Sequence, residues 1–200
     1  MLKAKFNTDY ISIKIGIIFS KLGIPPNVWT LLALIPAVFG FASLYYHNLI
    51  LGLIFFIISG FIDAVDGAVA RVTGSETDKG AYLDGVIDRY VEILLYLGLL
   101  FYGLQEFLIP SPAWISLLIF GSIMTSYARA YADHKGIVTE PEELKSMGGI
   151  LERFERLTLI FIGMLAGYFV LIYLTYAVIL VAVLANITAL QRILFVVGKK

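Results

Sequence analysis

Apolar runs near the length needed to cross a bilayer recur along the whole chain. A helix of about 20 apolar residues spans the hydrocarbon core of a membrane. The runs predict six such helices, over residues 28–46, 49–70, 82–104, 113–133, 154–173 and 175–196. Hydrophobic residues make up 60% of the chain, and this excess over a typical soluble domain must face lipid. The expected fold class is therefore an all-α integral membrane protein with six transmembrane helices.

The basic residues fall on one side of this predicted topology. The connections around residues 46–48, 110–112 and 173–176 contain no Lys or Arg. Positive-inside bias therefore predicts an even number of spans, with both termini and the charged connections in the cytoplasm. The predicted location is the cytoplasmic membrane. The 15 residues on the cytoplasmic side are Lys3, Lys5, Lys14, Lys21, Arg71, Lys79, Arg89, Arg129, Lys135, Lys145, Arg153, Arg156, Arg192, Lys199 and Lys200.

The segment before the first span has a different pattern. Between Lys3 and Leu22, apolar residues such as Tyr10, Ile13 and Ile17 recur at helical spacing, with lysines on the other face. This pattern predicts an amphipathic helix lying along the cytoplasmic surface of the membrane, and no cleavable signal peptide. No linker marks a further boundary. The expected organisation is a juxtamembrane helix in residues 1–25 and one six-span domain in residues 26–200.

Charge and cysteine content narrow the function classes. Lys and Arg together number 15, equal to Asp and Glu, so the chain has no excess of basic charge for a nucleic-acid partner. No cysteine is present, which excludes disulfides and thiol chemistry.

Four carboxylates lie inside the second and third predicted spans. Burying one unpaired carboxylate at mid-bilayer costs about 2.5–3.5 kcal/mol, so the four together require a neutralising partner. Asp63 and Asp66 are three residues apart, and Asp84 and Asp88 are four apart, so each pair shares one helix face. Asp63 precedes Arg71 by eight residues, which places it about 12 Å deeper in the membrane.

An oxygen cluster from two neighbouring helices suits Mg²⁺ or Mn²⁺. Two alternatives stay open at this point. Arg71 and Arg89 could neutralise the carboxylates, or the carboxylates could line a proton or ion pathway.

The residues between the carboxylates favour the metal interpretation. The stretch reads Asp63-Ala-Val-Asp66-Gly67-Ala-Val-Ala70-Arg71, eight residues, Gly80, three residues, Asp84, three residues, Asp88. It resembles the CDP-alcohol phosphotransferase signature, DxxDGxxARx(8)GxxxDxxxD, with every fixed position matched. Pro26-Asn27-Val28-Trp29-Thr30 is similar to the PNxxT that opens the first span of that family.

This resemblance implies an enzyme, a site and an assembly. The enzyme would transfer a phosphoalcohol group, such as phosphatidyl or archaetidyl, from a CDP-alcohol to an acceptor hydroxyl and release CMP. Asp63, Asp66, Asp84 and Asp88 would hold two Mg²⁺ or Mn²⁺ ions in a site that faces the cytoplasm, with Asp88 as the general base. Family members form homodimers in the membrane. The donor-binding residues implied by the motif are Asn27, Thr30, Asp66, Gly67, Ala70, Arg71 and Gly80.

The fourth cytoplasmic connection bears on the acceptor. Arg129, Lys135, Arg153 and Arg156 form a basic ring that suits an acceptor carrying phosphate. The stretch Glu152-Arg153-Phe-Glu155-Arg156-Leu is similar to one in phosphatidyl- and archaetidyl-inositol-phosphate synthases, whereas Tyr131 departs from their pattern. Inositol 1-phosphate is therefore the expected acceptor. Glycerol 3-phosphate, serine and other alcohols remain alternatives, as does a purely topological role for these charges.

Two other function classes compete with this hypothesis. An intramembrane prenyltransferase would need two Asp-rich motifs in a larger bundle, and an ion transporter would not need Gly67, Arg71 and Gly80 at fixed offsets. Glu92 continues the Asp84–Asp88 face, and His134 lies in the basic connection. The sequence assigns a role to neither residue.

Overall fold

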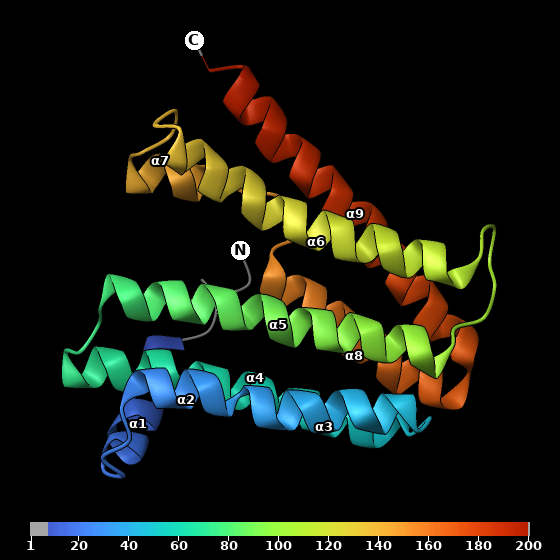
Figure 1. The fold of residues 1–200 in the computed structure, drawn as a ribbon, viewed down its shortest axis with the longest axis horizontal. Helices are drawn as coiled ribbons and strands as arrows, with labels where there is room; N and C mark the ends of the chain where they lie inside the picture. The colour runs from blue at the N-terminus through green and yellow to red at the C-terminus, as the bar shows by residue number, and fades with distance from the viewer. Residues whose placement is uncertain (1–7, 200) are drawn as a thin grey trace. The chain divides into compact units, whose positions relative to one another are not determined.

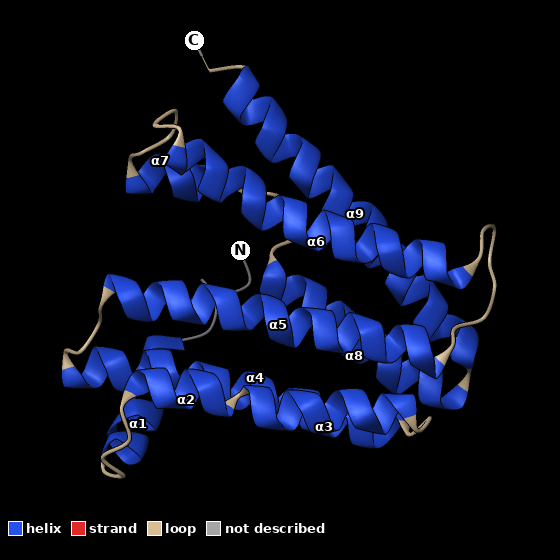
Figure 2. Ribbon diagram, viewed as in Figure 1, coloured by secondary structure: helices blue, strands red, loops and turns tan. Residues whose placement is uncertain are grey.

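A computed structural model describes residues 8–199, and within that range every regular element is a helix (Figures 1 and 2). Lys3 and Lys5 of the expected surface helix lie outside the described residues. An isolated bridge between Phe107 and Ile109 forms no strand. The helices are α1 Thr8–Ser20, α2 Pro26–Leu32, α3 Leu34–Tyr45, α4 Leu49–Thr73, α5 Asp78–Tyr102, α6 Ser111–His134, α7 Pro141–Ser146, α8 Arg153–Phe169 and α9 Leu171–Val197. The predicted all-α class is confirmed.

The chain divides into two compact units, residues 1–98 and 99–200. In the first unit α4 is the central helix, and α1, α2 and α3 all pack against it. A cluster of Trp29, Val65 and Val69, with Ile15 and Phe19 of α1 against it, joins three of these helices. In the first unit, α1 and α2 therefore pack against the half of α4 that carries Asp63, Asp66 and Arg71.

The first predicted span, residues 28–46, consists of two helices. Pro36 has no backbone N–H, so it cannot bond the carbonyl of Leu32, and the helix is interrupted at Ala33. The Ala33 carbonyl accepts a hydrogen bond from the Ser59 hydroxyl of α4 at 2.8 Å. The interruption is thus tied to the neighbouring helix.

Both ends of α4 carry the signals expected for a helix terminus. The Asn48 side chain accepts a hydrogen bond from the Leu51 N–H at 3.0 Å, and Gly74 ends the helix with a φ of 63°. The helix therefore runs to Thr73, three residues beyond its predicted end. The next helix, α5, begins at Asp78 rather than at residue 82.

In the second unit α9 packs against both α6 and α8. The chain turns at Val170, which is extended (φ −143°, ψ 107°), so the prediction of a turn at residues 173–176 was wrong. The turn is tight because Gly163 and Gly167 let α9 approach closely. A Cβ on Gly167 would lie 2.6 Å from the Leu174 Cβ, and one on Gly163 would lie 2.3 Å from the Ala177 Cβ.

Within residues 8–199, three helical segments are long and apolar enough to cross a membrane: Pro26–Tyr45, Leu49–Thr73 and Leu171–Val197. Among the other predicted spans, α5 carries Asp84, Asp88, Arg89 and Glu92, and α8 has only 17 residues. Large apolar side chains remain exposed on the outer surfaces, including Phe39 at 55% and Leu190 at 57%. These features support a membrane protein.

Candidate active site

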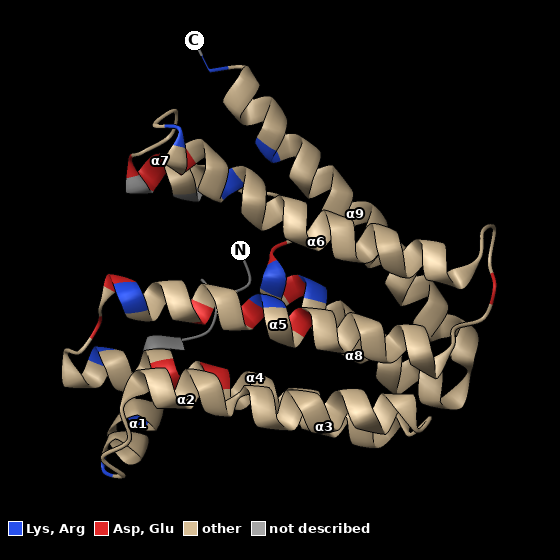
Figure 3. Cartoon of the chain, in the orientation of Figure 1, with Lys and Arg blue, Asp and Glu red and all other residues tan. Residues whose placement is uncertain are grey.

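Three carboxylates meet in the first unit. Asp63 and Asp66 project from α4 and Asp84 from α5, and one oxygen of each lies within 4.8 Å of the others. Asp66 is buried, with 7% of its surface exposed. Figure 3 shows acidic residues on both α4 and α5. The i, i+3 spacing on α4 aligns the first two carboxylates, and α5 brings the third to them.

The residues of this cluster fit a divalent cation. Three like charges this close together repel one another in a partly buried site, and a cation relieves that repulsion. Carboxylate oxygens are also the ligands that Mg²⁺ and Mn²⁺ prefer. Thr30 of α2 donates a hydrogen bond to Asp66 Oδ2 at 2.5 Å, which fixes the orientation of this carboxylate.

Asp88, the fourth predicted ligand, lies one turn further along α5 and is not part of this cluster. The Arg89 Nη2 is 3.7 Å from Asp88 Oδ2, and the Arg89 Nη1 is 2.6 Å from Glu92 Oε2. Tyr96 donates a hydrogen bond to the other Glu92 oxygen at 3.2 Å. Glu92, which had no assigned role, is therefore part of an ionic network that holds Arg89 beside Asp88.

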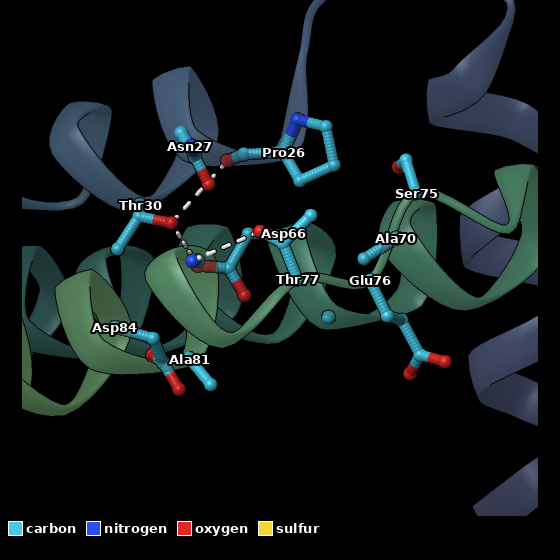
Figure 4. Close-up of a pocket in the computed structure, with 12 residues that line it drawn as sticks. Pro26, Asn27, Thr30, Asp66, Ala70, Ser75, Glu76, Thr77, Ala81 and Asp84 are labelled. Carbon is cyan, nitrogen blue, oxygen red and sulfur yellow. Dashed lines mark hydrogen bonds between the residues drawn. The ribbon is translucent and has the colours of Figure 1, made fainter.

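A cavity of about 210 Å³ adjoins the carboxylate cluster (Figure 4). Six of the seven predicted donor-binding residues line it: Asn27, Thr30, Asp66, Gly67, Ala70 and Gly80. Asp84, predicted as a metal ligand, also lines it. The lining residues that the sequence reasoning did not assign to the site are Pro26, Ser75, Glu76, Thr77 and Ala81. Ser75, Glu76 and Thr77 fall in the eight-residue gap of the motif. The fixed length of that gap was therefore the sequence feature that could have indicated their place in the site.

Gly80 sits where a side chain would intrude on this cavity. A Cβ there would lie 3.1 Å from both Asn27 Oδ1 and Thr77 Oγ1. The Gly80 N–H donates to the Thr77 hydroxyl at 3.0 Å, which stabilises the first turn of α5. Glycine therefore lets the first turn of α5 approach Asn27 of α2.

Arg71, the seventh predicted donor residue, lies beside the cavity rather than in its lining. A Cβ on Gly67 would lie 3.3 Å from Arg71 Nη1, so the guanidinium folds back over Gly67. The Arg71 Nη2 donates to the Ser12 hydroxyl of α1 at 2.6 Å. The Arg71 guanidinium is thus held next to Gly67, which lines the cavity.

A second cavity, of about 310 Å³, lies within the second unit. Its lining residues are Ser126, Arg129, Ala130, Asp133, Leu144 and Arg192. Arg129 was predicted to bind the acceptor, and the structure places it here. Lys135, Arg153 and Arg156 do not line this cavity. Lys135 instead lies with its Nζ 5.3 Å from the Tyr131 ring centre, and Arg156 is buried, with 1% exposed.

Arg192 is the basic residue that sequence reasoning missed at this cavity. It is 4% exposed, and its guanidinium donates to the carbonyls of Gly148 and Thr125 at 2.9 and 2.6 Å. Glu152 Oε1 lies 3.7 Å from both Arg192 and Arg129. An arginine inside the last apolar run was the signal that could have identified it, because charges within a span are costly and commonly functional.

Known proteins resemble this chain over most of its length. The family profile described as CDP-alcohol phosphatidyltransferase matches residues 24–196. An archaetidylinositol phosphate synthase of Pyrococcus horikoshii is 34% identical over 180 residues, covering 90% of this chain and 87% of that protein. A phosphatidylinositol phosphate synthase of Mycolicibacterium smegmatis is 33% identical over 183 residues, covering 86% and 78%.

Solved structures also resemble this chain over most of its length. The Mycobacterium tuberculosis phosphatidylinositol phosphate synthase with CDP-DAG bound superposes with a TM-score of 0.78 at 28% identity, covering 94% of both chains. A structure of the same enzyme in complex with manganese and citrate superposes with a TM-score of 0.77 at 27% identity, covering 92% of this chain and 88% of that one. With the family profile matching nearly the whole chain, the protein belongs to the CDP-alcohol phosphatidyltransferase family and is a membrane-associated transferase of phospholipid biosynthesis.

Proposed function

We propose that this enzyme transfers the phosphatidyl or archaetidyl group of a CDP-lipid to inositol 1-phosphate and releases CMP. The observation that carries the reaction is the carboxylate cluster beside a cavity lined by the motif residues. The choice of donor is supported by the solved relative with CDP-DAG bound. The choice of acceptor is supported by relatives that are archaetidylinositol and phosphatidylinositol phosphate synthases.

Asp63, Asp66 and Asp84 are the proposed ligands of the first of two Mg²⁺ or Mn²⁺ ions, with Asp88 completing the second site. When bound, a pair of divalent cations stabilises both the attacking and the leaving oxygens of a phosphoryl transfer. The Thr30 hydroxyl would keep Asp66 oriented, because its 2.5 Å hydrogen bond occupies only one oxygen of that carboxylate. The manganese complex of a solved relative supports the metal type.

Other residues of the chain would bind the CDP-lipid donor or activate the attacking hydroxyl. Asn27, Gly67, Ala70 and Gly80 would form the wall against which the nucleotide lies. Arg71 would stabilise negative charge on the diphosphate and on departing CMP, since a guanidinium binds phosphate oxygens in a bidentate way. Asp88 would accept the proton of the acceptor hydroxyl, with Arg89 and Glu92 holding it in place.

Arg129 and Arg192 are the proposed phosphate-binding residues for the acceptor, because both line the second cavity. The Arg129 Nε is buried and makes no hydrogen bond, so a donor is available there. The predicted contributions of Lys135, Arg153 and Arg156 remain predictions. An acceptor that carries no anionic group, such as free inositol, would bring no counter-charge to this pair beyond that of Glu152.

The membrane arrangement completes the proposal. Six spans with both termini in the cytoplasm would account for the distribution of Lys and Arg in the sequence. Helix α1 would lie on the cytoplasmic surface of the membrane. Its apolar side chains Tyr10, Ile13 and Ile17 are about half exposed, at 56%, 50% and 46%, and would contact lipid there. Residues 26–200 would form the catalytic domain of a homodimer, with the active site facing the cytoplasm.

The test is CMP release by the purified protein in the presence of Mg²⁺. CDP-diacylglycerol and CDP-archaeol would each be offered with inositol 1-phosphate, glycerol 3-phosphate, serine and free inositol. We expect release with inositol 1-phosphate and little with the other acceptors. Release with serine or free inositol at an equal rate would contradict the acceptor, and no release with any donor would contradict the reaction.

A further inference from the structure

One hydrogen bond joins the N-terminal helix to the proposed donor site. Arg71 Nη2 donates to Ser12 Oγ at 2.6 Å, across 59 residues of sequence. Arg71 lies in the last turns of α4, is exposed, and folds over Gly67, which lines the donor cavity. Ser12 is therefore the group on α1 that restrains this arginine.

The backbone of α1 is held close to the same turns of α4. A Cβ on Gly16 would lie 2.4 Å from the Ala68 carbonyl oxygen and 2.6 Å from Val72 Cγ2, so only glycine permits this approach. On the same side of α1, Ile15 and Phe19 pack against the Trp29, Val65 and Val69 cluster. The hydroxyl of Ser12 is thus carried on a helix that is itself fixed next to Arg71.

An exposed arginine has many rotamers, and binding an anion costs the entropy of selecting one of them. A hydrogen bond that already selects the rotamer lowers this cost. The Ser12 hydroxyl engages one of the five N–H donors of the guanidinium, which leaves the others for phosphate oxygens.

We propose that Ser12 is a positioning residue for Arg71, so that docking of α1 onto α4 is coupled to binding of a nucleoside diphosphate. This inference rests on the proposed function, which assigns the donor diphosphate to Arg71. Ser12 contacts no reacting group. It acts only through the orientation of the arginine.

The experiment compares three serine variants by CMP release, with donor and acceptor titrated separately. Ser12→Ala raises the KM for CDP-lipid about fivefold, equivalent to ~1 kcal/mol, which is the range for a typical intramolecular hydrogen bond. The acceptor KM and kcat stay within twofold of wild type. Ser12→Thr keeps the hydroxyl and retains the wild-type donor KM. Ser20→Ala is the matched control, because Ser20 lies on the same helix and donates to the Ile17 carbonyl instead.

A second variant tests the role of helix docking. Gly16→Ala leaves Ser12 intact but displaces α1 from α4, and it raises the donor KM at least as much as Ser12→Ala. The double variant shows no further rise, since both changes break the same contact. Direct binding of CDP, measured by calorimetry, follows the donor KM.

The outcomes separate this inference from the proposed function. If wild type releases no CMP from a CDP-lipid, the proposed function fails, and the inference fails with it. If wild type is active and Ser12→Ala matches Ser20→Ala in donor KM and CDP affinity, only the Ser12 assignment is overturned. A lower melting temperature with an unchanged donor KM would also overturn it, because Ser12 would then only stabilise the packing of α1.

Discussion

The carboxylate site in residues 1–98 and the arginine cavity in residues 99–200 are built in different ways. The carboxylates come from two helices joined by a short connection, and their spacing follows one continuous motif from Asp63 to Asp88. The two cavity arginines come from α6 and α9, more than 60 residues apart, with Glu152 lying 3.7 Å from each. The first site therefore contains the residues proposed to carry out the reaction, whereas the second brings together the two arginines proposed to bind the acceptor phosphate. Substitutions in the two regions should consequently affect different kinetic constants.

The largest expected effect belongs to the metal cluster. Asp84→Asn should lower CMP release by about 10³-fold, the upper range for removing one group that stabilises a charged transition state. The protein should stay folded, because the change also relieves repulsion among carboxylates within 4.8 Å of one another. Activity and melting temperature would be measured with Mg²⁺ and in EDTA. Full activity of wild type in excess EDTA would refute the metal site.

A smaller loss should follow from Asp88→Asn. The substitution removes the proposed proton acceptor with little change in volume, and we expect about a 10²-fold fall in kcat. CDP binding should persist, because Asp88 does not line the donor cavity. A parallel loss of CDP affinity would indicate that Asp88 acts chiefly as a metal ligand, together with the other three carboxylates.

In the second region Arg129→Gln should change binding rather than turnover. A charge-assisted contact contributes about 1.5–3 kcal/mol, so the KM for inositol 1-phosphate should rise about tenfold. The donor KM should not change. Lys135→Gln is the comparison variant, since Lys135 does not line the cavity and should have the smaller effect. Equal effects of both substitutions would indicate a general electrostatic attraction instead of a defined phosphate site.

The smallest expected effect is at Gly80. In Gly80→Ala the new methyl group would lie 3.1 Å from Asn27 Oδ1, and the exposed Asn27 side chain can move away. The donor KM should rise about threefold, equivalent to ~0.7 kcal/mol. Gly85→Ala on the same helix is a suitable control, because a Cβ there meets no atom within 4 Å. A change in the acceptor KM instead of the donor KM would contradict the assignment of this cavity.

The sequence by itself determined the chemistry of the first region. Long apolar runs required helices, and carboxylates three and four residues apart required shared helix faces, so four carboxylates were predicted to lie together. Three of them, Asp63, Asp66 and Asp84, form the cluster, whereas Asp88 lies outside it. The motif also identified six of the cavity residues, because its elements are close in sequence and its gap has a fixed length. Local spacing carries this information since neighbouring residues on a helix have fixed relative positions.

Only the tertiary structure decided which distant residues meet. Arg192 looked like one more basic residue at the end of the chain, but the packing of α9 on α6 brings it to the cavity of Arg129. The contact of Ser12 with Arg71 likewise depends on how closely Gly16 lets α1 approach α4. The turn at Val170 depends on Gly163 and Gly167. Each of these features is set by side-chain packing between helices, and the periodicity of a single helix contains no information about its partner.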